Sequence, residues 1–273
     1  TEDVTANYTI TPVAGTLTIL PKAVTVTAQD KEFAYTGAAQ NWPQYNVDGL
    51  VGSDMITAVV EGIITFPSEG TVTNELKSHE FTAGISENYA VGYVNGALTM
   101  TNNSSAITLT AASQSWTYDG EAHSDTGYTA AFGEGLTGEK QPDGSYLLST
   151  GDSLTAVVEG TITNAGKADN VVTGCQVTRG AADVTSFYTI GTVNGTLEVT
   201  KKALEITANS NSKEYDGTPL TDDGYSSSAL AAGDSLVSVT VTGSQTDVGS
   251  GDNVPSAASI KNSADEDVTA SYD

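Results

Sequence analysis

Apolar and polar side chains alternate along several short runs of the chain. The runs at residues 23–28, 204–208 and 236–242 read AVTVTA, LEITA and LVSVTVT, with an apolar residue at every second position. A period of two is typical of β-strands that have one buried and one solvated side. No segment shows a convincing helical period. The pattern therefore predicts an all-β protein, and the abundance of Thr, Val, Gly and Ser favours the same class.

These runs belong to a longer pattern that recurs along the chain. TAVVEG stands at residues 57–62 and again at 155–160. A Tyr two residues before a Gly, a Gly/Asp/Ser cluster and a strand-like run follow one another in order, beginning with YTG at 35–37, YDG at 118–120 and YDG at 215–217. Fixed self-similarity of this kind indicates tandem modules. We define residues 22–104, 105–200 and 201–273 as repeat 1, repeat 2 and repeat 3.

The two ends of the chain do not coincide with these boundaries. Residues 1–21 match the segments that close repeats 1 and 2, so we interpret them as the closing hairpin of a preceding repeat, whereas repeat 3 lacks its closing hairpin. In the two complete copies, VNG at 94–96 and 193–195 predicts a type I′ turn that joins the last two strands. We expect a fragment of a longer array, with possible head-to-tail strand pairing between chains, because an open strand edge is a template for another strand.

The motifs YDG, GDS and VNGTL and the junction VTKKALEIT resemble the MBG/YDG-type tandem repeats of bacterial cell-surface proteins. The resemblance extends over essentially the whole chain, although repeat 1 has YTG in place of YDG. It implies tandem Ig-like modules of adhesins and stalks, an extracellular location on the bacterial cell surface, and no enzyme activity. The expected architecture is a tandem array of three small Ig-like β-sandwich modules in an elongated rod. Modules of β-grasp type, which need a helix each, are the competing topology.

Charge narrows the choice of partners. Ten basic residues against 34 acidic ones give a net charge of −24, so such a surface repels nucleic acid. The acidic segments at 247–253 and 262–269 leave calcium binding open, but neither has the spacing of an EF-hand loop. We therefore predict no metal site and no cofactor. No apolar run is long enough to cross a bilayer, so membrane insertion is not expected.

Catalytic signatures are also missing from the sequence. His79 and His123 fall at non-equivalent positions in polar surroundings, and there is no GxSxG elbow, so both are interpreted as exposed structural histidines. The single cysteine, Cys175, stands in a strand-like run and is expected to be a small buried apolar residue. Repeat 2 has no lysine at its opening strand, and we predict no Lys–Asn isopeptide bond. We predict that the protein is not an enzyme.

Two places where the repeats differ are candidate ligand-binding sites. Repeat 2 carries an extra segment at 138–149 whose PDG predicts a tight turn in a protruding hairpin, with Lys140, Asp143 and Tyr146 as contact residues. Trp42 and Tyr45 stand together beside a proline in repeat 1. Both features are also compatible with purely structural roles. The repeated tyrosines of the YTG and YDG motifs, Tyr35, Tyr118 and Tyr215, are expected to pack against the glycine turn that follows them.

These observations predict a non-catalytic, semi-rigid acidic spacer or stalk of a bacterial surface protein, in which adjacent repeats of the same polypeptide contact one another. The alternative is an adhesin segment that binds a host glycan or protein through the repeat 2 insertion or the Trp42 patch.

Overall fold

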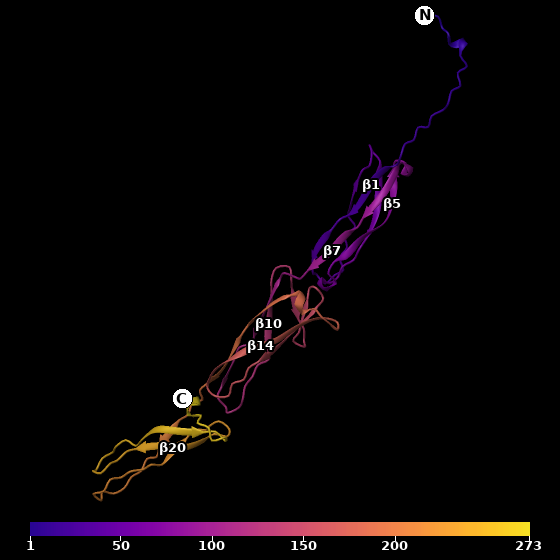
Figure 1. Ribbon diagram of the computed structural model, residues 1–273. Coiled ribbons are helices and arrows are strands. Elements are labelled where there is room, and N and C mark those ends of the chain that lie inside the picture. Colours follow the sequence, from indigo (N-terminus) through magenta and orange to yellow (C-terminus); the bar gives the residue numbers. More distant parts are fainter. The chain divides into compact units, whose positions relative to one another are not determined.

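The computed structural model describes residues 1–273, which form β-strands and short 3-10 turns without any α-helix (Figure 1). The all-β class predicted from the sequence is therefore confirmed. The chain divides into two compact units, Thr1–Asn102 and Asn103–Asp273. No helix in either unit is long and apolar enough to span a membrane.

Unit 1 contains two sheets that share a core. One sheet has the strand order β3-β1-β6 and the other β2-β7-β5-β4. The central strand β1 pairs antiparallel with β3 and parallel with β6. Val26 of β1 packs with Ile56 of β4 and Leu76 of β5, so the buried side chains come from both sheets. The strands are β1 Lys22–Ala28, β2 Lys31–Ala34, β3 Tyr45–Asp48, β4 Met55–Glu61, β5 Val72–Ala83, β6 Tyr89–Val94 and β7 Gly96–Thr101, with 3-10 turns η1 Thr5–Asn7, η2 Pro67–Glu69 and η3 Ser86–Asn88.

Repeat 2, in unit 2, has the same pairing scheme. Its opening strand β8 pairs antiparallel with β10 and parallel with β16, and the second sheet has the order β11-β12-β13-β14-β17-β9. Ile107, Leu154 and Leu197, one from each of three strands in the two sheets, are fully buried. The strands are β8 Ala106–Ala111, β9 Gln114–Thr117, β10 Tyr128–Phe132, β11 Gly138–Lys140, β12 Tyr146–Leu148, β13 Ser153–Glu159, β14 Gly166–Arg179, β15 Ala182–Asp183, β16 Thr189–Val193 and β17 Gly195–Thr200, with the 3-10 turn η4 Thr185–Phe187.

Repeat 3, also in unit 2, has fewer strands. It consists of two two-stranded sheets, β18-β19 and β20-β21. Nothing in it corresponds to β16 or β17, the last two strands of repeat 2. Its elements are β18 Ile206–Ala208, β19 Tyr225–Ser227, β20 Ser235–Thr242, β21 Val254–Lys261 and the 3-10 turn η5 Thr269–Ser271.

The repeated hexapeptide TAVVEG has a structural cause. Its first five residues lie in β4 and β13, and in both strands the register shifts at the Val–Val pair, as in a β-bulge. The glycine that follows lies against a buried asparagine. A Cβ atom on Gly62 would lie 2.9 Å from Oδ1 of Asn74, and one on Gly160 would lie 2.7 Å from Oδ1 of Asn170. Only glycine therefore fits at this position.

That buried asparagine joins separate segments of each repeat. The Asn74 amide donates to the carbonyl oxygens of Gln29 and Trp42 at 3.0 and 2.8 Å. Asn170 in repeat 2 and Asn253 in repeat 3 each make two equivalent bonds. A buried carbonyl without a donor is costly. The asparagine therefore stabilises the two segments that carry these carbonyls, which lie outside the β-strands.

The predicted closing hairpins are wrong. β6 and β7, on either side of the first VNG, belong to different sheets, as do β16 and β17. Neither residue of the Asn–Gly pair has the positive φ that a type I′ turn requires. The glycine instead permits a close approach between the sheets, because a Cβ on Gly195 would lie 2.1 Å from the carbonyl oxygen of Ala112.

Residues 1–21 form no hairpin either. Apart from η1 they contain no regular element, and all of their side chains are exposed (indigo thread in Figure 1). Leu17 is 100% exposed and Ile19 97%, whereas the equivalent residues of repeat 2, Leu197 and Val199, are 0% and 2% exposed. These apolar side chains lack the partner surface that their counterparts have.

Candidate functional site

The insertion in repeat 2 forms a hairpin, as predicted, but the hairpin does not protrude. β11 pairs with β12, and β12 pairs with β13, so the insertion extends the main sheet. The Asp143 carboxylate accepts hydrogen bonds from the backbone amide and hydroxyl of Ser145 at 3.0 and 2.7 Å, and Gly144 has a φ of 89°. Asp143 thus closes the turn, and the hydrogen bonds to Ser145 hold the pKa of its carboxyl below the usual value.

The other two candidates in the insertion contact the rest of repeat 2. Tyr146 is buried, and its ring lies 5.8 Å from those of Tyr128 and Phe132. Lys140 donates from Nζ to the Tyr128 carbonyl at 3.0 Å and lies over the rings of Tyr128 and Tyr146. The insertion therefore covers β10 with its own side chains, and Lys140 and Tyr146 are engaged in packing.

The Trp42 patch is engaged in a similar way. Lys31 lies 4.7 Å from the centre of the indole ring, and the indole N–H donates to the Gln29 side chain at 3.3 Å. Tyr45 packs against the core of unit 1. Trp42 and Tyr45 are thus part of the framework of repeat 1 and do not form a shared recessed surface.

A different constellation recurs in all three repeats. A tyrosine hydroxyl donates to the aspartate of the Gly/Asp/Ser cluster: Tyr89 to Asp54 at 2.6 Å, Tyr188 to Asp152 at 2.5 Å and Tyr272 to Asp234 at 2.6 Å. In repeats 1 and 3 the same hydroxyl accepts a backbone N–H, from Val51 and from Ala231 respectively. We call this group the Tyr–Asp site.

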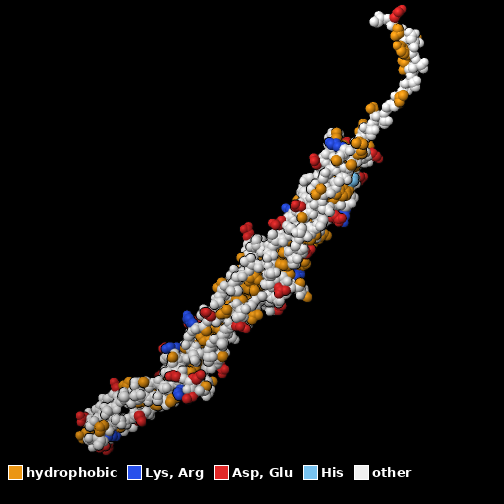
Figure 2. Space-filling model, viewed as in Figure 1, with side chains coloured by type: hydrophobic (Ala, Val, Ile, Leu, Met, Phe, Trp, Pro, Cys, Tyr) orange, Lys and Arg blue, Asp and Glu red, His pale blue; other side chains and the backbone are white.

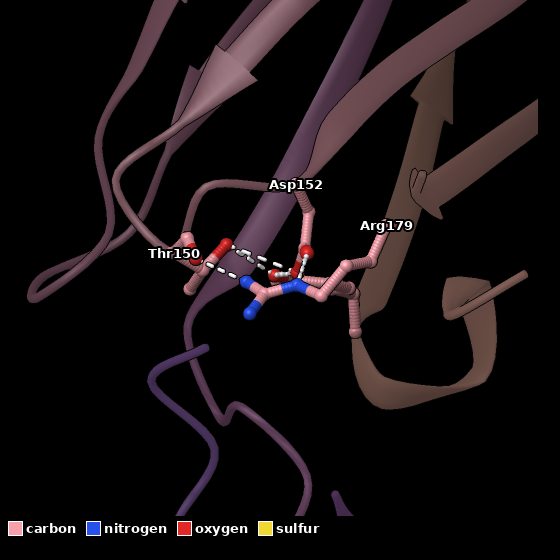
Figure 3. Close-up of polar contacts among 4 residues, drawn as sticks. Thr150, Asp152 and Arg179 are labelled. Atoms are coloured by element: carbon pink, nitrogen blue, oxygen red, sulfur yellow. Dashed lines mark hydrogen bonds and ion pairs between the residues drawn. The ribbon is translucent and has the colours of Figure 1, made fainter. Parts of the chain in front are cut away.

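The Tyr–Asp site of repeat 2 has an additional cation. Arg179, the single arginine of the chain, reaches the buried Asp152 carboxylate at 2.5 Å and also donates to the Thr150 carbonyl (Figure 3). Tyr188 and Thr150 hydroxyls lie 2.6 Å apart. A buried carboxylate is costly unless it is paired and hydrogen-bonded, and these contacts satisfy that condition.

The Tyr–Asp site of repeat 3 receives a side chain from repeat 2. Tyr118, the tyrosine of the repeat 2 YDG motif, is 2% exposed and belongs to a core cluster with Ala231, Ile260 and Val268 of repeat 3. Its ring lies 5.4 Å from that of Tyr272 in an edge-to-face arrangement. The expectation that this tyrosine packs on its own glycine turn is wrong, because Tyr118 is instead a contact between consecutive repeats.

The rest of the YDG motif shapes the same junction. Gly120 has a φ of 87°, and a Cβ there would lie 2.8 Å from the carbonyl oxygen of Ala232 in repeat 3. Asp119 accepts the backbone N–H of Glu121 at 2.9 Å, which lowers the pKa of its carboxyl. In this YDG motif the tyrosine therefore supplies the ring that contacts repeat 3, and the aspartate closes the turn. The glycine allows the backbone of repeat 3 to approach closely.

Burial at this junction changes the acidity of its hydroxyl groups. Burial, reinforced by the hydrogen bond to Asp234, raises the pKa of Tyr272 to about 12. Burial and the same carboxylate also raise the pKa of Tyr118. Both phenols therefore stay protonated and can donate hydrogen bonds at neutral pH.

The last repeat presents its YDG motif to solvent. Tyr215 is 66% exposed, and a Cβ on Gly217 would meet no atom within 4 Å. The expectation that Tyr215 packs against its turn is therefore wrong. Asp216 closes the turn by accepting the Thr218 backbone N–H at 2.9 Å, a bond that lowers the pKa of its carboxyl to about 2.

The two histidines and the cysteine have separate surroundings. His123 is half-buried and stacks on Trp116 at 4.7 Å, and exposed His79 contacts the Tyr93 hydroxyl. Cys175 is half-buried, less than expected, and burial raises the pKa of its thiol. No group of three or more His, Cys, Asp or Glu side chains is placed to hold a metal ion. Figure 2 shows acidic side chains scattered over the visible face, with far fewer basic ones.

No protein-family model matches the chain, and comparison with curated proteins gives no significant match.

Proposed function

We propose that this chain is a non-catalytic spacer segment of a bacterial cell-surface protein, built from Ig-like repeats of the MBG/YDG type, in which an inserted tyrosine stiffens the junction of repeats 2 and 3. The observation that carries the proposal is the burial of Tyr118 in a core cluster that repeats 2 and 3 share, with Val199 from repeat 2 and Ile260 from repeat 3. A buried aromatic ring that crosses a junction opposes bending, because rotation of one repeat would expose the ring to water.

The recurring residues support this reading. The Tyr–Asp site, the buried asparagine and the glycines of TAVVEG and VNG all act in packing or in the repeat junction. A recognition site would instead place distinctive side chains on an open surface, yet Lys140, Tyr146 and Trp42 contact their own repeat. The scattered acidic surface favours solubility and opposes association with polyanions.

Rigidity of the junction is the property to test. Spin labels at exposed positions 157 in β13 and 237 in β20, in a Cys175→Ser background, report the distance between repeats 2 and 3. A spacer gives one narrow distance distribution, and Tyr118→Ala broadens it. A broad distribution in the parent chain would contradict the proposal.

A binding screen tests the adhesin alternative. Host glycans and host proteins are presented to the chain and to the variants Trp42→Ala and Lys140→Ala. The spacer function predicts no saturable ligand. Saturable binding that is lost in either variant would replace the spacer by an adhesin segment and would locate its site.

A further inference from the structure

The edge strand of the second sheet of repeat 1 has no strand on its outer side. β4 ends the strand order β2-β7-β5-β4, and β5 is its strand partner. Both register shifts between these strands leave the extra residue on β5, at Lys77 and Thr82, so β4 is continuous over Met55–Glu61. An edge strand of this kind presents a row of backbone N–H and C=O groups with which another strand can pair.

The equivalent edges of the other two repeats are interrupted. In repeat 2, β12 pairs with the start of β13, at Ser153 and Leu154, and the sheet then ends in β11, a three-residue strand that carries Glu139 and Lys140. In repeat 3, the first register shift leaves the extra residue, Val237, on the edge strand β20 itself. Short charged strands and bulges both oppose edge-to-edge pairing. β4 has neither device.

Repeat 2 also shows what kind of element this edge accepts. β12 is antiparallel to β13, and Leu154 of β13 lies opposite Tyr146 and is fully buried. Ile56 of β4 stands at the position of Leu154, directly before the shared TAVVEG. The edge of β4 therefore fits an antiparallel strand.

The side chains of β4 are complementary to those of a second β4. Antiparallel pairing centred on Ala58 sets Ile56 opposite Val60 of the other copy. It also sets Thr57 opposite Val59. Members of the first pair are both buried in the single chain and members of the second are both exposed, so each residue meets one from the same face of its sheet. All four are β-branched, and such cross-strand pairs stabilise a sheet.

The charges of the edge allow the same pairing. Over its seven residues β4 carries one charge, on Glu61, which this register places opposite Met55. No like charges therefore lie directly opposite one another in the ladder. The rest of the surface repels a second copy, since the chain has a net charge of −24, and salt screens that repulsion.

We propose that β4 of repeat 1 pairs antiparallel with β4 of a second copy of this chain, so that two chains associate laterally through one continuous sheet. Backbone hydrogen bonds along the two edges supply the affinity. One strand edge is much smaller than the standard interface of about 1,600 Å², so the dimer is weak, with a dissociation constant of about 0.1 mM. This association goes beyond the spacer function and does not depend on it.

Sedimentation equilibrium tests the association. The parent chain is expected to form a reversible dimer, and to dimerise more strongly at high than at low salt because the two acidic chains repel each other. A chain that remains monomeric at about 1 mM in high salt would refute the proposal and would leave the edge to a strand of another protein.

Charge placement tests the register. Thr57→Lys combined with Val59→Lys sets a lysine opposite a lysine at two places in the ladder, and the dissociation constant is expected to rise by about 10-fold. This variant also lowers the net negative charge, so a general charge effect would strengthen association instead. Thr57→Lys combined with Val59→Glu sets each lysine opposite a glutamate and should restore the parent dissociation constant. All of these substitutions replace exposed side chains, and thermal unfolding checks that repeat 1 keeps its fold.

The second copy of the hexapeptide provides the matched control. Thr155→Lys combined with Val157→Lys changes the same two residues of TAVVEG in β13, whose start already pairs with β12. We expect the dissociation constant to stay at the parent value. The proposal is wrong if this control weakens the dimer as much as the lysine pair in β4, if that lysine pair has no effect, or if the lysine–glutamate pair does not restore association.

Discussion

Replacing Tyr118 by alanine would remove the ring that repeat 2 inserts into repeat 3. Tyr118 is 2% exposed, whereas its equivalent in the last repeat, Tyr215, is 66% exposed. The same substitution in the same motif is thus made once in a buried and once in an open environment. Tyr215→Ala is therefore the matched control.

The loss of stability expected for Tyr118→Ala follows from the burial of its ring. Replacing a fully buried large aromatic side chain by alanine costs about 3–5 kcal/mol, through lost transfer free energy and the cavity left behind. The edge-to-face contact with Tyr272 is lost as well. We expect the free energy of opening repeat 3 to fall by about 3 kcal/mol in Tyr118→Ala, and by less than about 0.5 kcal/mol in Tyr215→Ala.

Amide hydrogen exchange measures the free energy of opening in individual strands. The amides of β21, which carries the buried Ile260 of the shared cluster, are expected to exchange about 100-fold faster in Tyr118→Ala. The amides of β1 in unit 1 serve as an internal reference.

The reasoning would be refuted by equal exchange of β21 in the two variants. That result would mean that repeat 3 gains no stability from the tyrosine of repeat 2. The junction would then be a passive connection.

Three further predictions concern the framework. Gly195→Ala should destabilise repeat 2 by more than about 2 kcal/mol in urea unfolding, because its Cβ would lie 2.1 Å from a carbonyl oxygen, whereas Gly191→Ala, with no atom within 4 Å, should be nearly neutral. Asn170→Ala should cost about 2 kcal/mol in the same assay, since it leaves the carbonyls of the half-buried residues Ala112 and Asp125 without this donor. The pKa of Tyr272 is about 12 in the folded chain against an ordinary 10, so its contribution is complete below pH 10 and is lost between pH 10 and 12; a titration of stability should show this fall, and Tyr272→Phe should reduce it.

Much of the architecture could be predicted from the sequence. Period-two alternation identified strands such as β1 and β20, because a half-buried strand must alternate its side chains. Repetition placed equivalent segments, and the turn at Asp143 and Gly144 followed from residues that favour it. Local patterns sufficed because local conformation and burial decide these features.

The VNG motif shows where local reasoning failed. Asn–Gly between two apolar runs suits a hairpin turn, but the sequence does not say whether the flanking strands pair with each other. In the structure they join different sheets, and the glycine is required by the close approach of Ala112. The backbone of a distant segment sets that requirement.

The contacts of the candidate ligand residues could not be predicted from the sequence for a related reason. Lys140 and Tyr146 stand in an insertion, and insertions are often exposed, yet this hairpin folds onto β10. Conversely, the Tyr–Asp site was missed, although the Gly/Asp/Ser cluster that supplies its aspartate was recognised. Tyr272 and Asp234 are 38 positions apart, so only the fold brings them together.

The sequence by itself thus determined the all-β class, the repeats and the residues that recur, because these depend on periodicity and on copying. The tertiary structure decided what the recurring residues do. Tyr118 and Tyr215 stand in the same motif, yet one is buried and the other exposed. The physical reason is that burial depends on the neighbouring surface, and a motif does not specify its neighbour.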